Sequence, residues 1–273
     1  MDLHSISDVV RPRGRDEIGP PRAGDALLGG GTWLFSEPQP HVRRLIDLGA
    51  LRWPALEAGA HGLTIAATCT VAELYAFEAP PGWNAAPLIG ECCRAFLASF
   101  KVWNTATVGG NLCLSLPAGP MISLCAALEG DCVIWTAEGG ERRMPAVGFA
   151  RGPQDPALAP GEVLRAIEIP VEALTRRFAF RRASLTPLGR SGVLLIGTRA
   201  RDDDFALTIT AATRRPVPLR FDEVPTRDAL HHAVTSIPLS LYYDDLHGLP
   251  DWRRHMTVLF AEEIRAELAE GAP

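Results

Sequence analysis

Lysine is almost absent from this 273-residue chain: Lys101 is the only lysine among 27 basic residues, and the others are arginine. The net charge is −5, and basic residues never form a block longer than two or three. Nucleic-acid binding and attachment to an anionic membrane surface both depend on clustered positive charge. The charge pattern therefore supports neither role, and we expect no nucleic-acid partner.

Long apolar runs are absent as well. No stretch approaches the roughly 18 uninterrupted apolar residues that a membrane-spanning helix needs. The N-terminal residues 1–12 lack the apolar centre and the small-residue cleavage site of an export signal. We expect a cytoplasmic protein without membrane insertion.

Cysteine is present, but not in a metal-binding pattern. No two cysteines have the Cys-x-x-Cys spacing, histidines are not placed to complete a zinc site, and only one pair is close in sequence. Neighbouring residues rarely bind the same iron, so an iron–sulfur cluster is not expected either. We predict reduced, mostly buried thiols and no metal site. The six cysteines are Cys69, Cys92, Cys93, Cys113, Cys125 and Cys132.

Two polar breaks rich in proline and glycine, at residues 11–24 and 152–161, divide the chain. Short apolar runs bounded by turn residues predict strands, and 3.6-residue periodicity predicts helices. The residues Asp202, Asp203 and Asp204 are expected to form a solvated turn, because the glycine and glutamate positions of a calcium loop are missing. Strands are expected at 26–28, 44–48, 63–67, 131–136, 163–169, 178–182, 193–199 and 205–212. Helices are expected from the Thr70 cap and at 87–100, 121–128, 227–235 and 253–270.

Strands mixed with helices, without regular βαβ alternation, favour an α+β fold in two parts. We expect a first domain over residues 1–160, with subdomains of about 1–55 and 56–160, and a C-terminal α+β domain over 161–273. The length of the chain permits one large domain or two of ordinary size.

Residues 28–34, which we call the first glycine loop, read Leu-Gly-Gly-Gly-Thr-Trp-Leu. Glycine lets backbone N–H groups approach a ligand without a Cβ in the way, and several N–H groups facing one point bind anions such as a diphosphate. Thr32 adds a hydroxyl donor. No Gly-Lys-Ser/Thr follows, and Leu34 stands where a dinucleotide fingerprint needs its third glycine. Alone, the pattern favours an ordinary turn.

Residues 107–113, the second glycine loop, read Thr-Val-Gly-Gly-Asn-Leu-Cys. Thr107 and Asn111 supply side-chain donors, and the two glycines again allow close approach of a ligand. An ordinary turn is the alternative here too. Two such loops in one chain, neither with Walker chemistry, make a split diphosphate site more credible.

Further motifs surround these loops in a fixed order. They are Leu-Ile-Asp-Leu at 45–48, Thr-Val-Ala-Glu-Leu at 70–74, Trp-Asn-Thr-Ala at 103–106, Pro-Gly-Glu-Val-Leu at 160–164, Phe-Arg-Arg-Ala-Ser at 180–184 and Ala-Thr-Arg-Arg-Pro-Val at 212–217. From about residue 26 to residue 218, their order and spacing resemble the FAD-binding (medium) subunit, or middle domain, of the xanthine dehydrogenase and carbon monoxide dehydrogenase family of molybdenum hydroxylases.

The resemblance implies a two-subdomain clasp for FAD, like that of the vanillyl-alcohol-oxidase flavoproteins, followed by a C-terminal α+β domain on the isoalloxazine side. It implies no catalytic acid, base or nucleophile, because the redox chemistry belongs to the cofactor. Carried over motif by motif, the expected FAD-binding residues are Gly29, Gly30, Gly31, Thr32, Trp33, Leu34, Thr107, Gly110, Asn111, Ser115, Leu164 and Arg181.

Four of these expectations are specific. Leu164 would pack against the flavin rings, and Arg181 would lie near the rings or the electron acceptor, although a surface arginine is the alternative. Trp33 replaces the acidic residue usual in the first loop, so a polar contact is lost or replaced by stacking; a packing role for Trp33 is the alternative. Gly119 and Pro120 replace the usual Ser-Asp pair, and Ser115 or a backbone group would compensate.

The resemblance also implies partners. A large subunit would carry the molybdenum cofactor and a small subunit two [2Fe-2S] clusters, in a dimer of heterotrimers. Electrons would pass from the clusters through this FAD to an external acceptor. The alternatives are a free-standing FAD-dependent oxidoreductase and a flavin-free assembly or interaction subunit.

Overall fold

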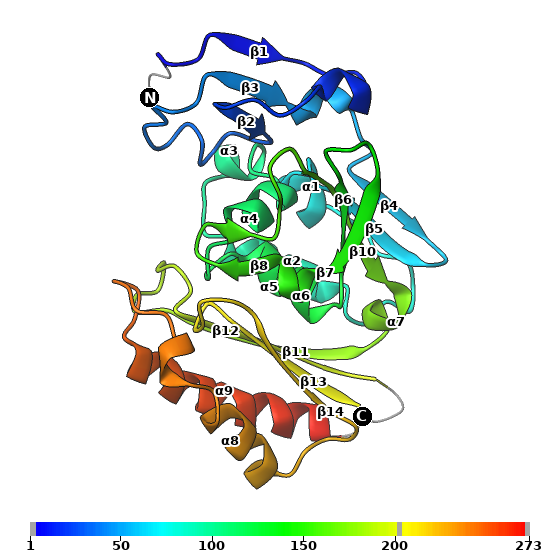
Figure 1. Cartoon of the computed structure of the whole chain (residues 1–273). Helices are drawn as coiled ribbons and strands as arrows, with labels where there is room; N and C mark the ends of the chain where they lie inside the picture. Colours follow the sequence, from blue (N-terminus) through cyan, green and yellow to red (C-terminus); the bar gives the residue numbers. More distant parts are fainter. Residues whose placement is uncertain (1–3, 201–203, 271–273) are drawn as a thin grey trace.

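The computed structural model describes residues 4–200 and 204–270. They form three layers that follow one another along the chain, from the N-terminal layer at the top of Figure 1 to the C-terminal layer at the bottom. The mixture of helices with largely antiparallel sheets confirms the predicted α+β class. None of the helices in these ranges combines the length and the apolarity that crossing a membrane requires.

The N-terminal layer is a small parallel sheet in the order β1-β3-β2. It contains β1 (Asp8–Val10), β2 (Asp25–Leu28) and β3 (Arg44–Asp47), with the 3-10 helices η1 (Arg15–Ile18) and η2 (Leu48–Leu51) beside them. Ile46 and Leu48 pack with Val163 of the next layer. Strand β2 ends where the first glycine loop begins, so this sheet carries that loop to the middle layer.

The middle layer is built on an antiparallel sheet in the order β4-β5-β10-β6-β7. Its central strand, β10, has no exposed residue, because helices cover one face of the sheet and aromatic residues pack on the other. The strands are β4 (Leu56–Gly59), β5 (Gly62–Ala66), β6 (Asp131–Trp135), β7 (Glu141–Pro145) and β10 (Val163–Pro170).

Helices fill the space beside this sheet and hold the second glycine loop. They are α1 (Val71–Tyr75), α2 (Pro87–Ala95), α3 (Phe100–Trp103), α4 (Val108–Leu114), α5 (Pro120–Ala127) and α6 (Ala146–Phe149), with the short ribbon of β8 (Ala150–Gly152) and β9 (Asp155–Pro156). Helix α5 is buried along its whole length. It contacts α2 and α4 on one side and the C-terminal sheet on the other, so it joins the two layers.

The C-terminal layer is an antiparallel meander in the order β11-β12-β13-β14. Strand β12 is buried on both faces because α5 covers one face and the long helix α9 the other. A Cβ on Gly197 would come within 2.2 Å of Ile264, which shows how closely α9 packs. The elements are β11 (Arg177–Ala183), β12 (Val193–Arg199), β13 (Phe205–Thr210), β14 (Val217–Phe221), α8 (Arg227–Thr235), η3 (Leu239–Leu241) and α9 (Pro250–Ala269). The short helix α7 (Val171–Leu174) precedes them and packs on β5 and β10 of the middle sheet.

Two sequence expectations differ from the structure. The helix expected over residues 87–100 ends at Ala95, and α3 starts anew at Phe100 after Ser99 has taken an extended conformation. The boundary expected between residues 160 and 161 would cut off β10, yet β10 pairs with β5 and β6 in the middle sheet. We therefore propose a division in which the chain leaves that sheet after Pro170. The acidic turn at 202–204 lies, except for Asp204, outside the described residues.

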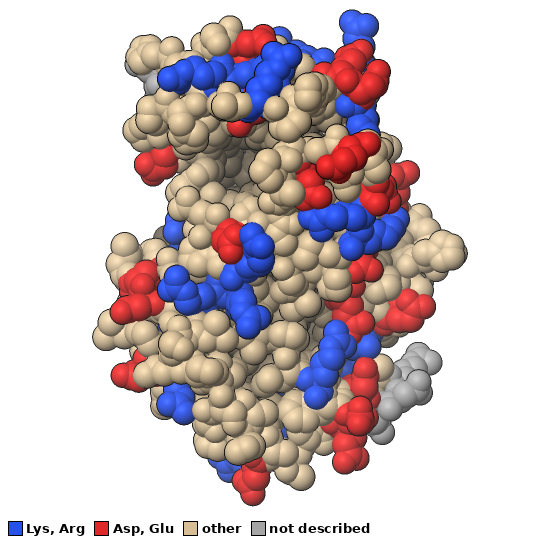
Figure 2. All heavy atoms as spheres, in the orientation of Figure 1, with Lys and Arg blue, Asp and Glu red and all other residues tan. Residues whose placement is uncertain are grey.

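Arginines and acidic residues are interspersed on the face shown in Figure 2. Many charged residues of the described chain are partners in ion pairs, such as Arg151 with Asp155 and Arg143 with Glu168. Exposed pairs of this kind contribute little to stability, typically about 0–1 kcal/mol each.

Candidate functional site

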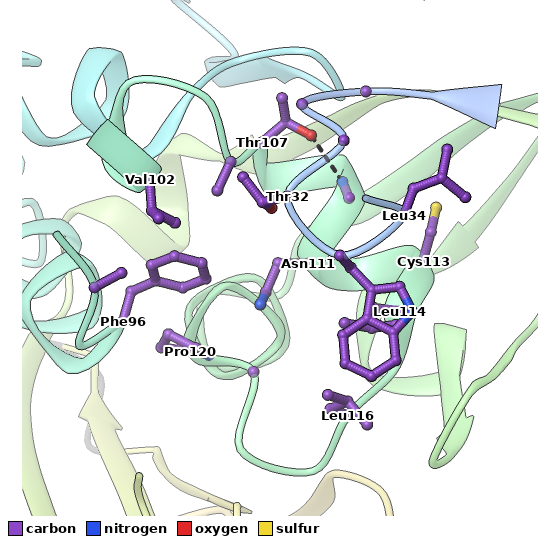
Figure 3. Close-up of a pocket in the computed structure, with 18 of the residues that line it drawn as sticks. Thr32, Leu34, Phe96, Val102, Thr107, Asn111, Cys113, Leu114, Leu116 and Pro120 are labelled. Carbon is purple, nitrogen blue, oxygen red and sulfur yellow. Dashed lines mark hydrogen bonds between the residues drawn. The ribbon is translucent and has the colours of Figure 1, made fainter. Parts of the chain in front are cut away.

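A pocket of about 550 Å³ lies where the two glycine loops meet, and the loop between β11 and β12 closes part of its rim. This volume is within the range of small-molecule and cofactor sites, about 300–1,000 Å³. Figure 3 shows the side chains that point into it from the first loop, from the α2–α3 turn and from α4. Predicted residues that line it are Gly29, Gly30, Gly31, Thr32, Trp33, Leu34, Thr107, Gly110 and Asn111.

The first glycine loop turns back on itself directly after β2. Gly31 has a φ of 70°, which favours glycine, and its carbonyl accepts a hydrogen bond of 2.8 Å from the N–H of Phe35. Within the described residues, no hydrogen bond inside the chain uses the backbone N–H groups of Gly30, Gly31 and Thr32. Three consecutive amide donors are thus left for a ligand, as an anion-binding loop requires.

The first loop lies against the second loop and against the two residues that precede it, Thr105 and Ala106. A Cβ on Gly30 would lie 1.6 Å from the carbonyl oxygen of Thr105, which is far closer than any real contact. A Cβ on Gly29 would lie 2.8 Å from the hydroxyl oxygen of Thr107. The glycines of the first loop are therefore needed for contact with the second loop as well as for access to a ligand.

The second glycine loop is held in place by the chain that precedes α1. The N–H of Val71 donates to Ala106 (2.9 Å), and the N–H of Val108 donates to Cys69 (2.8 Å). The Thr107 hydroxyl oxygen caps α4 by accepting from the N–H of Gly110 at 3.0 Å, the dashed line in Figure 3. These bonds fix the loop before any ligand binds.

Asn111 points from α4 into the pocket (Figure 3). Its Oδ1 accepts a 3.1 Å hydrogen bond from the N–H of Met121, which ties α4 to the start of α5. Because the oxygen is engaged, the side-chain NH₂ group is the part that can donate to an occupant. A Cβ on Gly119 would lie 2.8 Å from this Oδ1, so the glycine lets the loop before α5 approach Asn111.

The remaining walls of the pocket are mostly apolar. Phe96 and Val102 lie on one side, and Leu114 and Leu116 lie on another (Figure 3). Trp33 also lines the pocket. Apolar and aromatic walls of this kind suit flat ring systems. Trp33 exposes 38% of its surface, so its indole is free to pack against an occupant.

The charge in the pocket lining is small. Within residues 4–200 and 204–270, no Asp, Glu, His or Lys lines the pocket, and Arg190 is the one lining residue with a formal charge. Cys113 also lines the pocket, and burial raises the pKa of its thiol to about 12, so it is protonated at neutral pH. The cysteines of the structure are free thiols, and all but Cys113 are buried.

Behind the first loop, Asp25 on β2 and Arg44 on β3 form an ion pair with two hydrogen bonds of 2.7 and 2.6 Å. The bonds from Arg44 hold the pKa of Asp25 below its ordinary value, and the pKa of Arg44 is raised by the same contact. The pair fixes the register of β2 against β3 just before the chain enters the glycine loop.

This pair makes stability depend on pH. The folded pKa of Asp25 is lowered, so its contribution is present above the unfolded pKa of about 3.9 and is lost as the pH falls through the folded value. We expect Asp25→Asn to lower the free energy of unfolding by roughly 1.5–3 kcal/mol at pH 7. Urea unfolding of both proteins from pH 7 to pH 3 measures this. A difference that stays constant below pH 4 would contradict it.

Three predicted site residues do not line the pocket. Ser115 ends α4 in a left-handed conformation (φ 52°), and its hydroxyl donates to the carbonyl of Gly152 at 2.7 Å. Leu164 is 2% exposed in the core beside β6. Arg181 pairs with Glu263 and Glu267 of α9. Their expected contacts with a cofactor are not supported by these positions.

Sequence reasoning also missed several pocket residues. Phe96 lies in the helix predicted over residues 87–100, and Val102 lies in the segment after it, for which the sequence predicted no role. Leu188 and Arg190 lie in the loop between β11 and β12. The Arg-Arg pair at 181–182 was the available signal, because it marks the strand that leads to this loop.

Comparison with known proteins shows which family the chain belongs to. Residues 22–172 match a family described as "FAD binding domain in molybdopterin dehydrogenase", which is more than half of the chain. The chain belongs to this family. The match contains both glycine loops, and it confirms the resemblance to the FAD-binding subunits of molybdenum hydroxylases and FAD as the cofactor of this domain.

A curated member of this group is the caffeine dehydrogenase subunit beta of Pseudomonas sp. (strain CBB1), which is 30% identical over 140 residues. The match covers 50% of this chain and 46% of that protein, so the chain matches about half of its relative.

Solved structures share the fold along nearly the whole chain. Quinoline 2-oxidoreductase from Pseudomonas putida 86 superposes with a TM-score of 0.79 at 21% identity, covering 98% of both chains. Carbon monoxide dehydrogenase from Hydrogenophaga pseudoflava has a TM-score of 0.79 at 19% identity, covering 97% of both chains. Reconstituted carbon monoxide dehydrogenase from Oligotropha carboxidovorans has a TM-score of 0.74 at 20% identity, covering 97% of this chain and 99% of that chain. At these identities the likeness shows the fold alone, and it shows that the fold shared with these chains includes the C-terminal layer.

Proposed function

We propose that this chain is the electron-transfer subunit of a heteromeric molybdenum hydroxylase, and that it holds FAD with the diphosphate between its two glycine loops. The observation that carries the proposal is the set of free backbone N–H groups at Gly30, Gly31 and Thr32, pressed against the second loop. Thr107, Gly110 and Asn111 complete the proposed cradle.

The pocket fits this cofactor. The diphosphate would meet donors that no group in the described chain uses, and the rings would pack on the apolar walls. No lining carboxylate opposes the negative charge of the diphosphate. Trp33 takes the place of the acidic residue expected in the first loop, and its exposed indole replaces a polar contact with packing.

FAD, when bound, supplies the acceptance and the release of electrons. The residues of the chain bind it, orient it and keep water from its rings. In the part of the chain that the structure describes, no lining Asp, Glu, His or Lys is available to move a proton to or from a substrate. A free-standing oxidoreductase acting on its own substrate usually needs such a group, so the pocket favours the electron-transfer role.

The partners belong to the same proposal. A small subunit with two [2Fe-2S] clusters would deliver electrons, a large subunit with the molybdenum cofactor would oxidise the substrate, and two heterotrimers would pair in the cytoplasm. The name of the caffeine dehydrogenase relative, a beta subunit, supports a place in a larger assembly.

The visible spectrum of the natively purified protein tests this function. We expect flavin bands together with iron–sulfur absorption, and two other polypeptides that stay with the chain through size-exclusion chromatography. A stable complex without flavin bands would support the flavin-free alternative. A flavin-containing monomer that turns over a small substrate would support the free-standing oxidoreductase.

A further inference from the structure

Arg190 differs from most arginines of the described chain because it has no partner of its own. Arg44, Arg142, Arg181 and Arg253 each pair with a carboxylate. Among the described residues, neither a hydrogen bond nor an ion pair engages the side chain of Arg190, although it lines the pocket and is exposed. An unpaired guanidinium at the rim of a cofactor pocket is free to bind a negatively charged or hydrogen-bond-accepting occupant.

The loop that carries Arg190 is held in one shape by Arg182. The Nε of Arg182 donates to the hydroxyl of Ser191 at 2.7 Å, and its Nη2 donates to the carbonyl of Gly189. The N–H of Gly189 donates to Thr186 at 2.9 Å. Residues 189 and 191, on either side of Arg190, are therefore both fixed by one side chain.

Strand alternation separates the two neighbouring arginines. Side chains of successive residues in a strand point to opposite faces. Arg181 points to the face covered by α9, where Glu263 and Glu267 neutralise it. Arg182 points the other way and supports the loop. The positive charge that can meet a cofactor is therefore that of Arg190.

The Arg190 loop and the first glycine loop reach the pocket from different layers. The first glycine loop leaves the N-terminal sheet, whereas the β11–β12 loop leaves the C-terminal sheet (Figure 1). With the diphosphate on the glycine loops, the part of FAD that extends toward the C-terminal layer is one of its two ring systems. Adenine carries no formal charge for a guanidinium to match. The flavin has ring carbonyl oxygens, and it gains a negative charge when two electrons and one proton are taken up.

We propose that Arg190 is a cofactor-contacting residue that binds the flavin ring system and stabilises the negative charge that the rings gain on reduction. This inference rests on the proposed FAD site. Arg182 is then a positioning residue, which acts on the flavin only through the loop. A cation beside the flavin raises its reduction potential, because it favours the more negative form.

The test compares FAD-loaded wild type with Arg190→Met and Arg190→Lys. The dissociation constant of FAD is measured by fluorescence, and the midpoint potential is measured by equilibration with reference dyes. We expect Arg190→Met to make the potential more negative and to lower the preference for reduced over oxidised FAD by about tenfold. Arg190→Lys keeps the charge and should retain most of the wild-type potential, and Arg182→Met should shift it in the same direction as Arg190→Met.

Arg227→Met is the matched control, because it removes the same charge from an exposed site on α8 that does not line the pocket. Its potential should equal that of the wild type. An unchanged potential in Arg190→Met would overturn the inference. So would an equal loss of affinity for both redox forms, which would place Arg190 on the diphosphate. Failure of the wild-type chain to bind FAD would instead refute the proposed function itself.

Discussion

Replacing Gly30 with alanine is expected to weaken FAD binding by about 100-fold. The added Cβ would lie 1.6 Å from the carbonyl oxygen of Thr105, which is backbone and cannot rotate away. The first glycine loop must therefore move away from Thr105 and from the second loop that follows it, and the donors of Gly31 and Thr32 move away from the second half of the cradle. A cost of about 3 kcal/mol for such overpacking corresponds to the expected loss of affinity. Titration of the apo chain with FAD, followed by fluorescence, measures it.

Gly59→Ala provides the control for this experiment. A Cβ on Gly59 meets no atom within 4 Å, and this glycine does not have a positive φ. The variant should bind FAD with the wild-type affinity. If Gly30→Ala also binds like the wild type while remaining folded, the two loops do not form one site, and the split cradle is wrong.

Replacing Arg253 with alanine is expected to lower the free energy of unfolding by about 3–5 kcal/mol. Its side chain is 1% exposed and pairs with Asp245. Its Nε donates to Gly248 at 2.8 Å, and its Nη1 donates to both Gly192 and Ala211 at 2.6 Å. Truncation leaves a carboxylate and three carbonyls without their donors, and breaking a buried pair in this way carries a cost of that size.

The consequence of Arg253→Ala should extend to the pocket. The N–H of Ala211 donates to the carbonyl of Pro117, which lies between the pocket residues Leu116 and Ala118. We therefore expect a weaker FAD affinity alongside the lower stability. Urea unfolding compares this variant with Arg227→Ala, whose side chain is exposed and which should lose less than about 0.5 kcal/mol. Equal losses in the two variants would contradict the structural role of Arg253.

Much of the fold follows from local patterns in the sequence. The capping box at Thr70 and Glu73 is present, with hydrogen bonds of 3.1 and 2.8 Å, and it starts α1 as expected. Helix α8 has the expected bounds, and β12 runs over residues 193–199 as predicted. These elements succeed because capping, periodicity and β-branched content are encoded within a few residues.

The pairing of strands that lie far apart in the chain was harder to predict from the sequence. The polar loop at 152–161 suggested a domain boundary, but Val163–Pro170 returns to the middle sheet between β5 and β6. A loop composition does not state which sheet the next strand joins. The end of α2 at Ala95 was missed for a similar reason, since the apolar spacing continues through Phe96 and Leu97 while the backbone turns.

The glycine loops were the part of the site that the sequence could predict. Close approach of one backbone to another requires glycine, as at Gly30, and a run of glycines is visible in the sequence. The flavin contacts predicted for Leu164 and Arg181 depended on the face of the strand to which each side chain points, which the sequence does not give. The structure turns Leu164 into the core and Arg181 toward α9. Arg190 could not be singled out from sequence, because its importance lies in the absence of a partner within the described fold.

The most direct test of the split cradle is a crystal structure of the chain loaded with FAD. We predict that the diphosphate oxygens lie within hydrogen-bond distance of the N–H groups of Gly30, Gly31 and Thr32, with Asn111 or Gly110 on the opposite side. The result that would contradict this account is a diphosphate bound away from both glycine loops, with those three N–H groups still unused.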